Sequence, residues 1–251
     1  MRARLLTGLT AAALAFTIAP AAAAETHPHP TPYGPQRPYE PDVAGPVNID
    51  TGTAVYAPDG GSRFGVTITF DARRSTTTGV EPAAPREFVF LFDRSVRFNP
   101  HLFPTCDRSV IETQGAAACP DGSLVGSGRA EFYRGGAGEV LVFNTTFDHG
   151  RRGVLIHIPV SGAILENTLE RVVGDYRDDY GWGLNEIVPP NDTPPQDRPS
   201  TSAFAVTFGA VHNGHSFVQS YAKPGSEVAA GVWSEYVTGQ TTLVEGTLTR
   251  P

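Results

Sequence analysis

The chain of 251 residues is poor in cysteine, in lysine and in long apolar runs, and each shortage excludes something. Its two cysteines, Cys106 and Cys119, are too few for a four-ligand structural zinc site. Lys223 is its one lysine. Beyond residue 24 no segment approaches the ~18 consecutive apolar residues of a membrane-spanning helix, so we expect no transmembrane segment in the processed protein. Long amphipathic helical stretches are also lacking, which disfavours a helical fold.

The first 24 residues have the three parts of a secretory signal peptide. Arg2 and Arg4 form a basic start, residues 5–18 form a short apolar segment, and Ala22 and Ala24 put small residues where a signal peptidase needs them. The sequence therefore predicts a signal peptide at residues 1–24, cleavage after Ala24, and a secreted, extracellular protein. A retained N-terminal anchor is the alternative.

The charge balance is acidic. The formal net charge is −7 at pH 7, and it becomes about −9 without residues 1–24, which hold two arginines and no acid. Such a chain lacks the basic surface that nucleic acids require, and it is repelled by anionic membranes and acidic polysaccharides. We therefore expect no nucleic-acid partner, and we further expect a monomer.

Residues 25–46 are thick with proline. Because proline lacks an amide N–H and disfavours helix in the residue before it, this segment is predicted to be an extended, disordered leader. It would either space the protein from a cell wall or be a tail without a role. His27 and His29 alternate with prolines and would make at most a weak metal site. Residues 47–251 are predicted to form one domain.

The remaining chain has the period-two pattern of β-strands. Apolar residues alternate over 64–71, a near-continuous apolar run at 86–99 indicates a strand buried on both faces, and residues 123–149 indicate a hairpin with a glycine-rich turn. Residues 202–222 indicate a second hairpin, with Asn213–Gly214 in its turn. The predicted fold class is all-β, an antiparallel β-sandwich, with a jelly roll as one form of it.

Two segments do not fit a simple series of strands. Residues 164–173 fit a helix and a strand equally well, because their apolar residues lie near helical spacing while Thr168, Val172 and Val173 favour a strand. Residues 185–200 form a second proline cluster, which we interpret as a long surface loop within the same domain.

The two cysteines are predicted to form a disulfide bond. Their spacing is not that of a C-x-x-C redox motif, and a disulfide is the usual state of a cysteine pair in an exported protein. Closing a loop of about 14 residues stabilises a fold by roughly 3 kcal/mol in the chain-entropy model. After the second cysteine, Gly126 and Gly128 predict a bulge or a close backbone approach at the start of a strand.

The segment from Cys106 to Ala130 resembles a family of uncharacterised secreted or surface proteins of actinobacteria. The shared pattern is C…C-P-x-x-S-x-V-G-x-G-x-A, which this chain matches at Cys106, Cys119, Pro120, Ser123, Val125, Gly126, Gly128 and Ala130. The excess of arginine over lysine is also typical of GC-rich coding DNA. The family has no established activity, so the resemblance implies export and a β-rich fold, and it implies no chemistry.

The densest group of polar and aromatic residues lies between Gly174 and Glu186. Sugar sites in β-sandwiches combine carboxylates, which bind ring hydroxyls, with aromatic rings, which cover the apolar face of a pyranose. Glycosidases need two carboxylates at a set separation. The candidate ligand-binding residues are Asp175, Tyr176, Asp178, Asp179, Tyr180, Trp182 and Glu186.

No residue is nominated as catalytic, and no cofactor or metal is predicted. A structural calcium ion held by the same acids is an alternative, although the EF-hand spacing is missing. His157, His212 and His215 would form a zinc site only if the fold brought them together. No local motif nominates a serine nucleophile for a catalytic triad.

Two hypotheses about function follow. In the first, the chain is a secreted, non-catalytic protein that binds a glycan or another component of the cell envelope through its loops. In the second, it is an extracellular carbohydrate-active enzyme, a glycosidase or a lyase, that uses acids of the 175–186 loop. The second requires two carboxylates that face each other across an aromatic-lined cleft.

Overall fold

The computed structural model describes residues 26–32, 39–188 and 192–250, whose regular structure is mostly β. The strands are β1 (Asn48–Pro58), β2 (Val66–Thr76), β3 (Pro85–Asp93), β4 (Val96–Phe98), β5 (Leu124–Phe132), β6 (Ala137–Thr146), β7 (Arg152–Ile158), β8 (Ala163–Arg171), β9 (Tyr180–Ile187), β10 (Thr201–Phe208), β11 (Val211–His212), β12 (His215–Ser216), β13 (Val218–Ser220), β14 (Glu227–Tyr236) and β15 (Thr241–Thr249). The helices are α1 (Arg108–Gln114) and the 3-10 turns η1 (Pro100–Leu102), η2 (Ala116–Ala118), η3 (Asp148–Gly150), η4 (Gly174–Asp178) and η5 (Pro195–Asp197). Within the described ranges no helix has the length and apolar character needed to cross a membrane.

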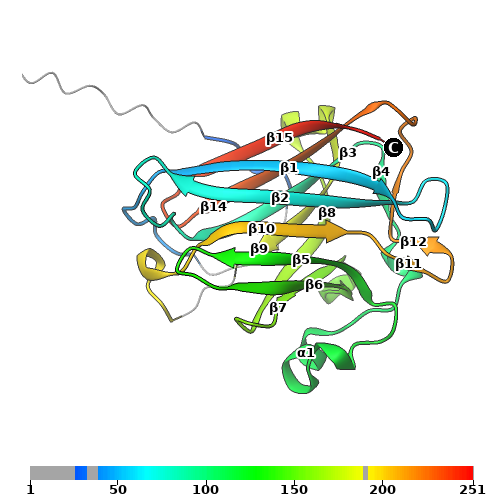
Figure 1. The fold of residues 1–251 in the computed structure, drawn as a ribbon, viewed down its shortest axis with the longest axis horizontal. Coiled ribbons are helices and arrows are strands. Elements are labelled where there is room, and N and C mark those ends of the chain that lie inside the picture. Colours follow the sequence, from blue (N-terminus) through cyan, green and yellow to red (C-terminus); the bar gives the residue numbers. More distant parts are fainter. Residues whose placement is uncertain (1–25, 33–38, 189–191, 251) are drawn as a thin grey trace, which may run out of the picture.

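Eleven strands form one antiparallel sheet in the order β1-β2-β10-β5-β6-β7-β8-β9-β3-β14-β15. Figure 1 shows this sheet folded over, with β1, β2, β10, β5 and β6 in the near layer and β7, β8, β9, β3 and β14 behind it. The edge strands β1 and β15 come side by side, so the sheet is nearly closed. The predicted all-β, antiparallel fold is confirmed.

The main core lies between the two layers. In β2 the buried side chains alternate as the period-two pattern predicts, with Val66, Ile68 and Phe70 facing inward. On the opposite layer, Phe90 and Phe92 of β3 meet the ring of Phe70 at centroid distances of 5.3 and 5.4 Å. Aromatic pairs at such distances stabilise a core beyond the area they bury.

β3 is buried on both faces, as its unbroken apolar run predicts. Its other face carries Val89 and Leu91, which belong to a second buried cluster on the outside of the rear layer, together with Val172, Tyr180 and Trp233.

The local turn predictions are confirmed, while one strand pairing differs. Asn213 and Gly214 both have positive φ, 49° and 76°, and they link the two-residue strands β11 and β12. The longer strands on either side of this turn do not pair with each other. β10 pairs with β2 and β5, and β13 pairs with β4. The segment that fitted both a helix and a strand forms β8, paired on both sides.

Gly126 and Gly128 meet the β10 backbone closely. A Cβ atom at either position would lie 2.0 Å from a carbonyl oxygen of β10, and the β5–β6 register shifts between Leu124 and Gly126. Both the close approach and the bulge predicted for these glycines are therefore present.

The cystine loop covers the outer face of β6, β7 and β8. Cys106 and Cys119 form the predicted disulfide. Cys106 and Ile111 of α1 are buried against Phe143 and Leu155. The loop therefore supplies the apolar lid of a small satellite core that the sheet alone would leave in water.

The proline-rich N-terminal segment differs from the expected disordered leader. Residues 26–32, hereafter the strap, lie on the outer face of the rear layer, where Pro30 and Thr31 are buried. Trp233 Nε1 donates a hydrogen bond of 3.1 Å to the His27 carbonyl, and Val173 N donates one of 2.8 Å to the Pro30 carbonyl. Proline's fixed extended backbone does not prevent docking, because the Trp233 side chain and the Val173 amide donate hydrogen bonds to carbonyls of the strap.

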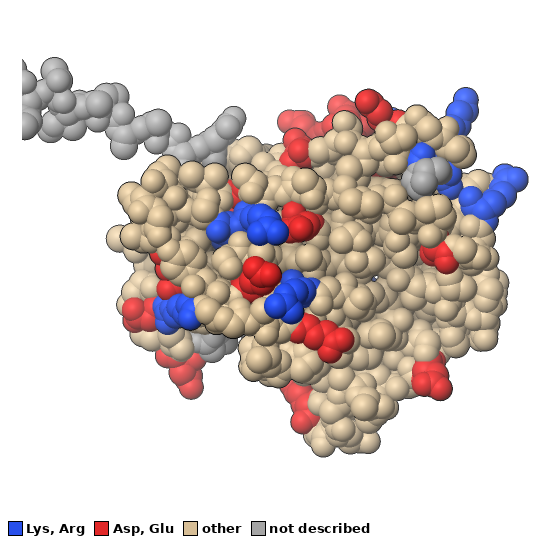
Figure 2. Space-filling model, viewed as in Figure 1, with Lys and Arg blue, Asp and Glu red and all other residues tan. Residues whose placement is uncertain are grey.

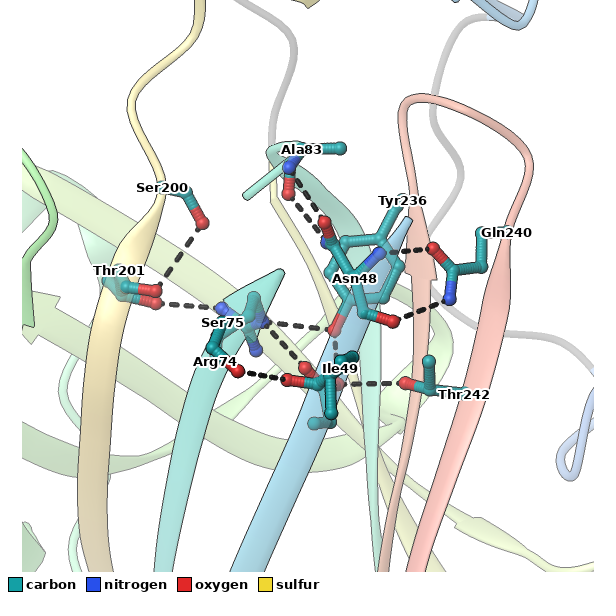
Figure 3. A network of polar contacts seen from close by, with 11 residues as sticks. Asn48, Ile49, Arg74, Ser75, Ala83, Ser200, Thr201, Tyr236, Gln240 and Thr242 are labelled. Carbon is teal, nitrogen blue, oxygen red and sulfur yellow. Dashed lines mark hydrogen bonds and ion pairs between the residues drawn. The ribbon is translucent and has the colours of Figure 1, made fainter. Parts of the chain in front are cut away.

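A buried polar network joins the two edges of the sheet (Figure 3). Arg74 of β2 donates to Asp50 of β1 (Nε–Oδ1, 3.2 Å) and to the Tyr236 hydroxyl (2.9 Å), and Tyr236 in turn donates to Asp50. Thr242 of β15 donates a 2.8 Å hydrogen bond to Asp50 as well. Nearby, the Gln240 amide bonds both the N–H and the carbonyl of Asn48, as a neighbouring strand would. Side chains thus replace the backbone ladder that β1 and β15 lack here.

Removing the disulfide should destabilise the fold by roughly 3 kcal/mol, because the unfolded chain regains the freedom of a loop of about 14 residues. The change is Cys106→Ala with Cys119→Ala, and the measurement is the free energy of unfolding in urea. Reducing agent should lower the unfolding midpoint of the unaltered protein and leave that of the double variant unchanged. Equal midpoints for both proteins without reductant would contradict the stabilising role of the bond.

Asp50→Asn should cost about 3–5 kcal/mol of folding free energy, because it leaves the buried Arg74 guanidinium without its carboxylate. Thr242→Val removes one hydrogen bond from the same carboxylate and serves as the matched control, with an expected loss of about 1 kcal/mol. Urea unfolding of both variants at pH 7 measures the difference. A smaller loss for Asp50→Asn than for Thr242→Val would show that the ion pair is not what holds the edges together.

Candidate functional site

The four acids of the predicted ligand-binding segment do not come together. Asp175, Asp178 and Asp179 are exposed on and just after η4. Glu186 lies on β9, opposite the inward-facing Phe88, and is fully buried in the interior. Glu186 is therefore separated from the loop acids by the sheet itself, so these acids do not form the paired carboxylates that a glycosidase needs.

The aromatic residues of that segment are engaged in packing. The Tyr176 hydroxyl donates a 2.8 Å hydrogen bond to the Pro28 carbonyl of the strap. Tyr180 is buried and donates a 2.9 Å hydrogen bond to Glu245; burial, reinforced by the charge of Glu245, raises the pKa of Tyr180. The two tyrosines therefore hold the β8–β9 connection in place rather than offering open faces to a sugar.

Trp182, the third aromatic residue, contacts Arg171, which lines a cleft that was not predicted from the sequence. The guanidinium of Arg171 lies 3.8 Å from the Trp182 ring centroid, the geometry of a cation–π contact. A cleft of about 490 Å³ begins there. It is lined by Arg94, Arg97, Arg171, Val172, Val173, Arg177, Tyr180 and Gly181, and we call it the arginine cleft.

Two connections, β3–β4 and β8–β9, bring these arginines together. Arg94 and Arg97 come from the β3–β4 turn and β4, Arg171 ends β8, and Arg177 lies in η4. Arg94 N donates a 3.1 Å hydrogen bond to the Asp179 carbonyl, which ties the first connection to the one after η4. The two connections therefore form one wall around the cleft.

Two of the arginines are held in defined positions. Arg97 Nη1 donates hydrogen bonds of 2.7 Å to the carbonyls of Arg94 and Val96, and Arg171 is stacked on Trp182. Neither contact neutralises the positive charge. The entropy of ordering a long side chain is thus partly lost before any ligand arrives, which favours binding.

The charge of the cleft is uncompensated. Among the described residues none of its four arginines makes an ion pair with a carboxylate within 4.0 Å. Arginines elsewhere do have such partners: Arg86 pairs with Asp42 at 2.5 Å and Arg134 with Glu81 at 2.8 Å. Grouping four unpaired cations is unexpected in a chain of net charge −7.

On the face of the molecule drawn in Figure 2, positive and negative side chains lie near one another, unlike in the arginine cleft. Blue and red side chains alternate there toward one end of the near layer, and much of the remaining face is uncharged. Arg73 lies 3.9 Å from Asp71, and Arg129 lies 3.6 Å from Glu131, so positive and negative groups on this layer sit together.

The histidines singled out in the sequence remain apart. His212 and His215 face each other across the β11–β12 turn, whereas the His157 ring on β7 bonds the Ala163 carbonyl at 3.0 Å. Among the described residues no three or more His, Cys, Asp or Glu side chains are grouped so as to hold a metal ion.

Glu186 has strongly shifted ionisation. Burial raises its pKa from the ordinary 4.5 to about 8, against a hydrogen bond from Asn167 and the charge of Arg74, both of which lower it. Its Oε2 atom has no hydrogen-bond partner. Glu186 is therefore a neutral acid in the core at neutral pH, and it is no part of the arginine cleft.

Comparisons of the chain with protein-family models, with curated proteins and with solved structures find no match. The assignment of a function therefore depends on the geometry of the site alone.

Sequence reasoning missed Arg94, Arg97, Arg171 and Arg177 because no local signal joins them. Each stands among different neighbours, and up to 83 residues separate the first from the last. Only the pairing of β8 with β9 and of β9 with β3 brings their ends of the strands together.

Glu186→Gln should stabilise the fold increasingly as the pH rises from about 4.5 to 8. Over this range the unfolded state releases the Glu186 proton while the folded state keeps it, so folding stability falls with rising pH in the unaltered protein. The gain should be on the order of 3 kcal/mol at pH 7 and near zero at pH 4. Urea unfolding across this pH range measures it. Asp178→Asn, which changes an exposed acid, should leave the pH profile unaltered, and a profile that Glu186→Gln also leaves unaltered would contradict the shifted ionisation.

Proposed function

We propose that the chain is an exported, non-catalytic binding protein whose arginine cleft holds a small anionic ligand outside the cell. The observation that carries this proposal is the grouping around one cleft of four arginines that make no ion pair with any carboxylate of the described residues. Guanidinium groups bind carboxylate, sulfate and phosphate oxygens through paired, charge-assisted hydrogen bonds. An anionic ligand would supply the ion-pair partners that the described residues do not give these arginines.

The size and lining of the cleft narrow the class of ligand. A volume of about 490 Å³ lies in the range of small-molecule sites. Val172 and Val173 give it an apolar wall beside the arginines. An acidic sugar, or a short segment of an acidic glycan, combines charged groups with such an apolar face, and it agrees with the expected location near the cell envelope.

The net negative charge of the chain does not oppose this choice. At physiological ionic strength exposed charges are screened beyond about 8 Å, so a bound ligand senses mainly the groups that line the cleft. Long acidic polymers would still meet the acidic surroundings, including Asp175 and Asp178 on η4. We therefore expect short acidic ligands to bind better than long ones.

Export is supported by the signal-like N-terminus and by the disulfide, which suits an oxidising compartment. The absence of paired carboxylates at the 175–186 loop leaves no specific observation in favour of the glycosidase hypothesis. Binding without catalysis is accordingly the function we propose.

Replacing two cleft arginines, Arg171→Gln with Arg177→Gln, should weaken binding of an acidic oligosaccharide roughly a hundredfold, since each charge-assisted hydrogen bond contributes about 1.5–3 kcal/mol. Sulfated, phosphorylated and uronic-acid oligosaccharides on a glycan array select the probe, and calorimetry at low and physiological salt measures its affinity. Binding should weaken with salt.

The matched control is Arg129→Gln with Arg152→Gln, which removes the same charge from another surface and should change affinity less than threefold by screening alone. Equal losses in the two double variants, a preference for neutral glycans, or no binding of any anionic probe would each overturn the proposed function.

A further inference from the structure

The strap lies in a groove on the outer face of the rear layer, which adjoins the arginine cleft and shares Val172, Val173 and Tyr180 with it. The floor of this groove is the second apolar cluster, in which Val89, Leu91 and Trp233 are buried, with Tyr176 at its edge. The strap does not add a strand to the sheet, because it pairs with no strand edge. It is held instead by side chains, in the manner of an extended proline-rich peptide on an aromatic surface.

Side chains and one backbone amide of the domain bind the main chain of the strap. Its carbonyls at His27, Pro28 and Pro30 accept hydrogen bonds of 3.1, 2.8 and 2.8 Å from Trp233 Nε1, the Tyr176 hydroxyl and Val173 N. The His27 amide donates a 2.8 Å hydrogen bond to Thr241. Two of these three acceptors are prolines, which present a carbonyl but no competing N–H.

Two side-chain pockets alternate with these contacts. His29 Nε2 lies 2.6 Å from Glu87 Oε1, and the imidazole packs edge-on against the Trp233 ring at 4.8 Å. Two residues on, Thr31 Oγ1 accepts a 2.8 Å hydrogen bond from Asn185 Nδ2 and is almost fully buried. The groove therefore distinguishes side chains as well as following a backbone.

The strap provides hydrogen-bond partners for polar side chains of the groove that it covers. With the strap in place, Glu87 and Asn185 are buried beside a second buried polar pair, Thr168 and Glu170, and a buried polar group without a partner destabilises a fold. Gly183 leaves room for Thr31, because a Cβ atom there would come within 2.7 Å of Thr31 Cγ2. These features fit the pattern His-x-Thr and are unnecessary for an unspecific tail.

We propose that this groove is a peptide-recognition site for the segment His27–Thr31, filled by the chain's own strap and able to take the strap of a second copy. The contacts are the same in cis and in trans, so exchange costs no interaction, as in domain swapping. Residues 33–47 connect the strap to β1, and this tether gives the cis strap a high effective concentration. We therefore expect binding of a second copy's strap to be detectable when the chain's own strap is impaired.

Charge at His29 sets the pH dependence of the contact. The charged groups that face it are Glu87 of β3 and Glu170 of β8. Burial lowers the pKa of His29, but the hydrogen bond and charge of Glu87, aided by the Thr31 carbonyl and Glu170, outweigh it, and the pKa is raised. Docking is thus favoured fully below the ordinary pKa of about 6.5 and weakens as the pH rises through the raised value.

Two complementary full-length variants test the proposal. The strap variant, His29→Ala with Thr31→Ala, has an impaired strap and an intact groove. The groove variant, Glu87→Gln with Trp233→Phe, has an intact strap and an impaired groove.

Each variant alone should sediment as a monomer. An equimolar mixture at pH 6 should form a one-to-one complex, and this complex should be weaker at pH 8. A synthetic peptide of residues 26–32 should displace that complex and bind the strap variant at least about tenfold more tightly than the unaltered chain, as measured by fluorescence polarisation.

Circular dichroism of each variant checks the fold. If Trp233→Phe disturbs it, Glu87→Gln with Thr241→Val replaces the groove variant. Glu139→Gln, an exposed acid on β6, added to the strap variant is the matched control and should leave peptide affinity unchanged. A mixture of folded variants that stays monomeric, or a peptide with alanine at both pocket positions that binds equally well, would overturn the proposal.

Discussion

The two edge strands of the sheet impose the constraint on which the rest of the structure depends. β1 and β15 lie side by side without a described backbone ladder, and unpaired strand edges invite association with other chains. The protein joins them through the Asp50 carboxylate, which is bound at once by Arg74, Tyr236 and Thr242 from three other strands. Because this junction lies inside the fold, the outer faces of both layers remain free to carry binding surfaces.

Both proposed surfaces lie on, or at the ends of, the strands of the rear layer. β8, β9, β3 and β14 present the groove on their outer face, and the connections at their ends form the arginine cleft. The strap touches both, since Val173, which lines the cleft, donates its N–H to the Pro30 carbonyl. A rigid sheet that positions ligand-binding connections is a common way to build a site on a β fold.

The sequence predicts what depends on near neighbours along the chain. Alternation in β2, the Asn213–Gly214 turn, the disulfide, and the glycines that approach β10 each follow from a few adjacent residues. It predicts less where distant strands decide the outcome. The side to which Glu186 points depends on register, and β3 and β9 shift register between Phe92 and Asp93, opposite Tyr180–Trp182. The proline content predicted a free leader. Nothing in the sequence of the strap indicates that it binds Trp233 and Glu87, which follow about 200 and 60 residues later.

The position of β10 between β2 and β5 has a consequence for how the chain acquires its shape. Strands β5 to β8 each pair with the next strand along the chain, so β6 to β9 can each join as soon as they are synthesised. The inner edge of β2, by contrast, waits until Thr201–Phe208 exists, more than 120 residues later. Until then a nascent molecule carries an open β2 edge, and the arrival of β10 is the step that turns a growing meander into a two-layered protein.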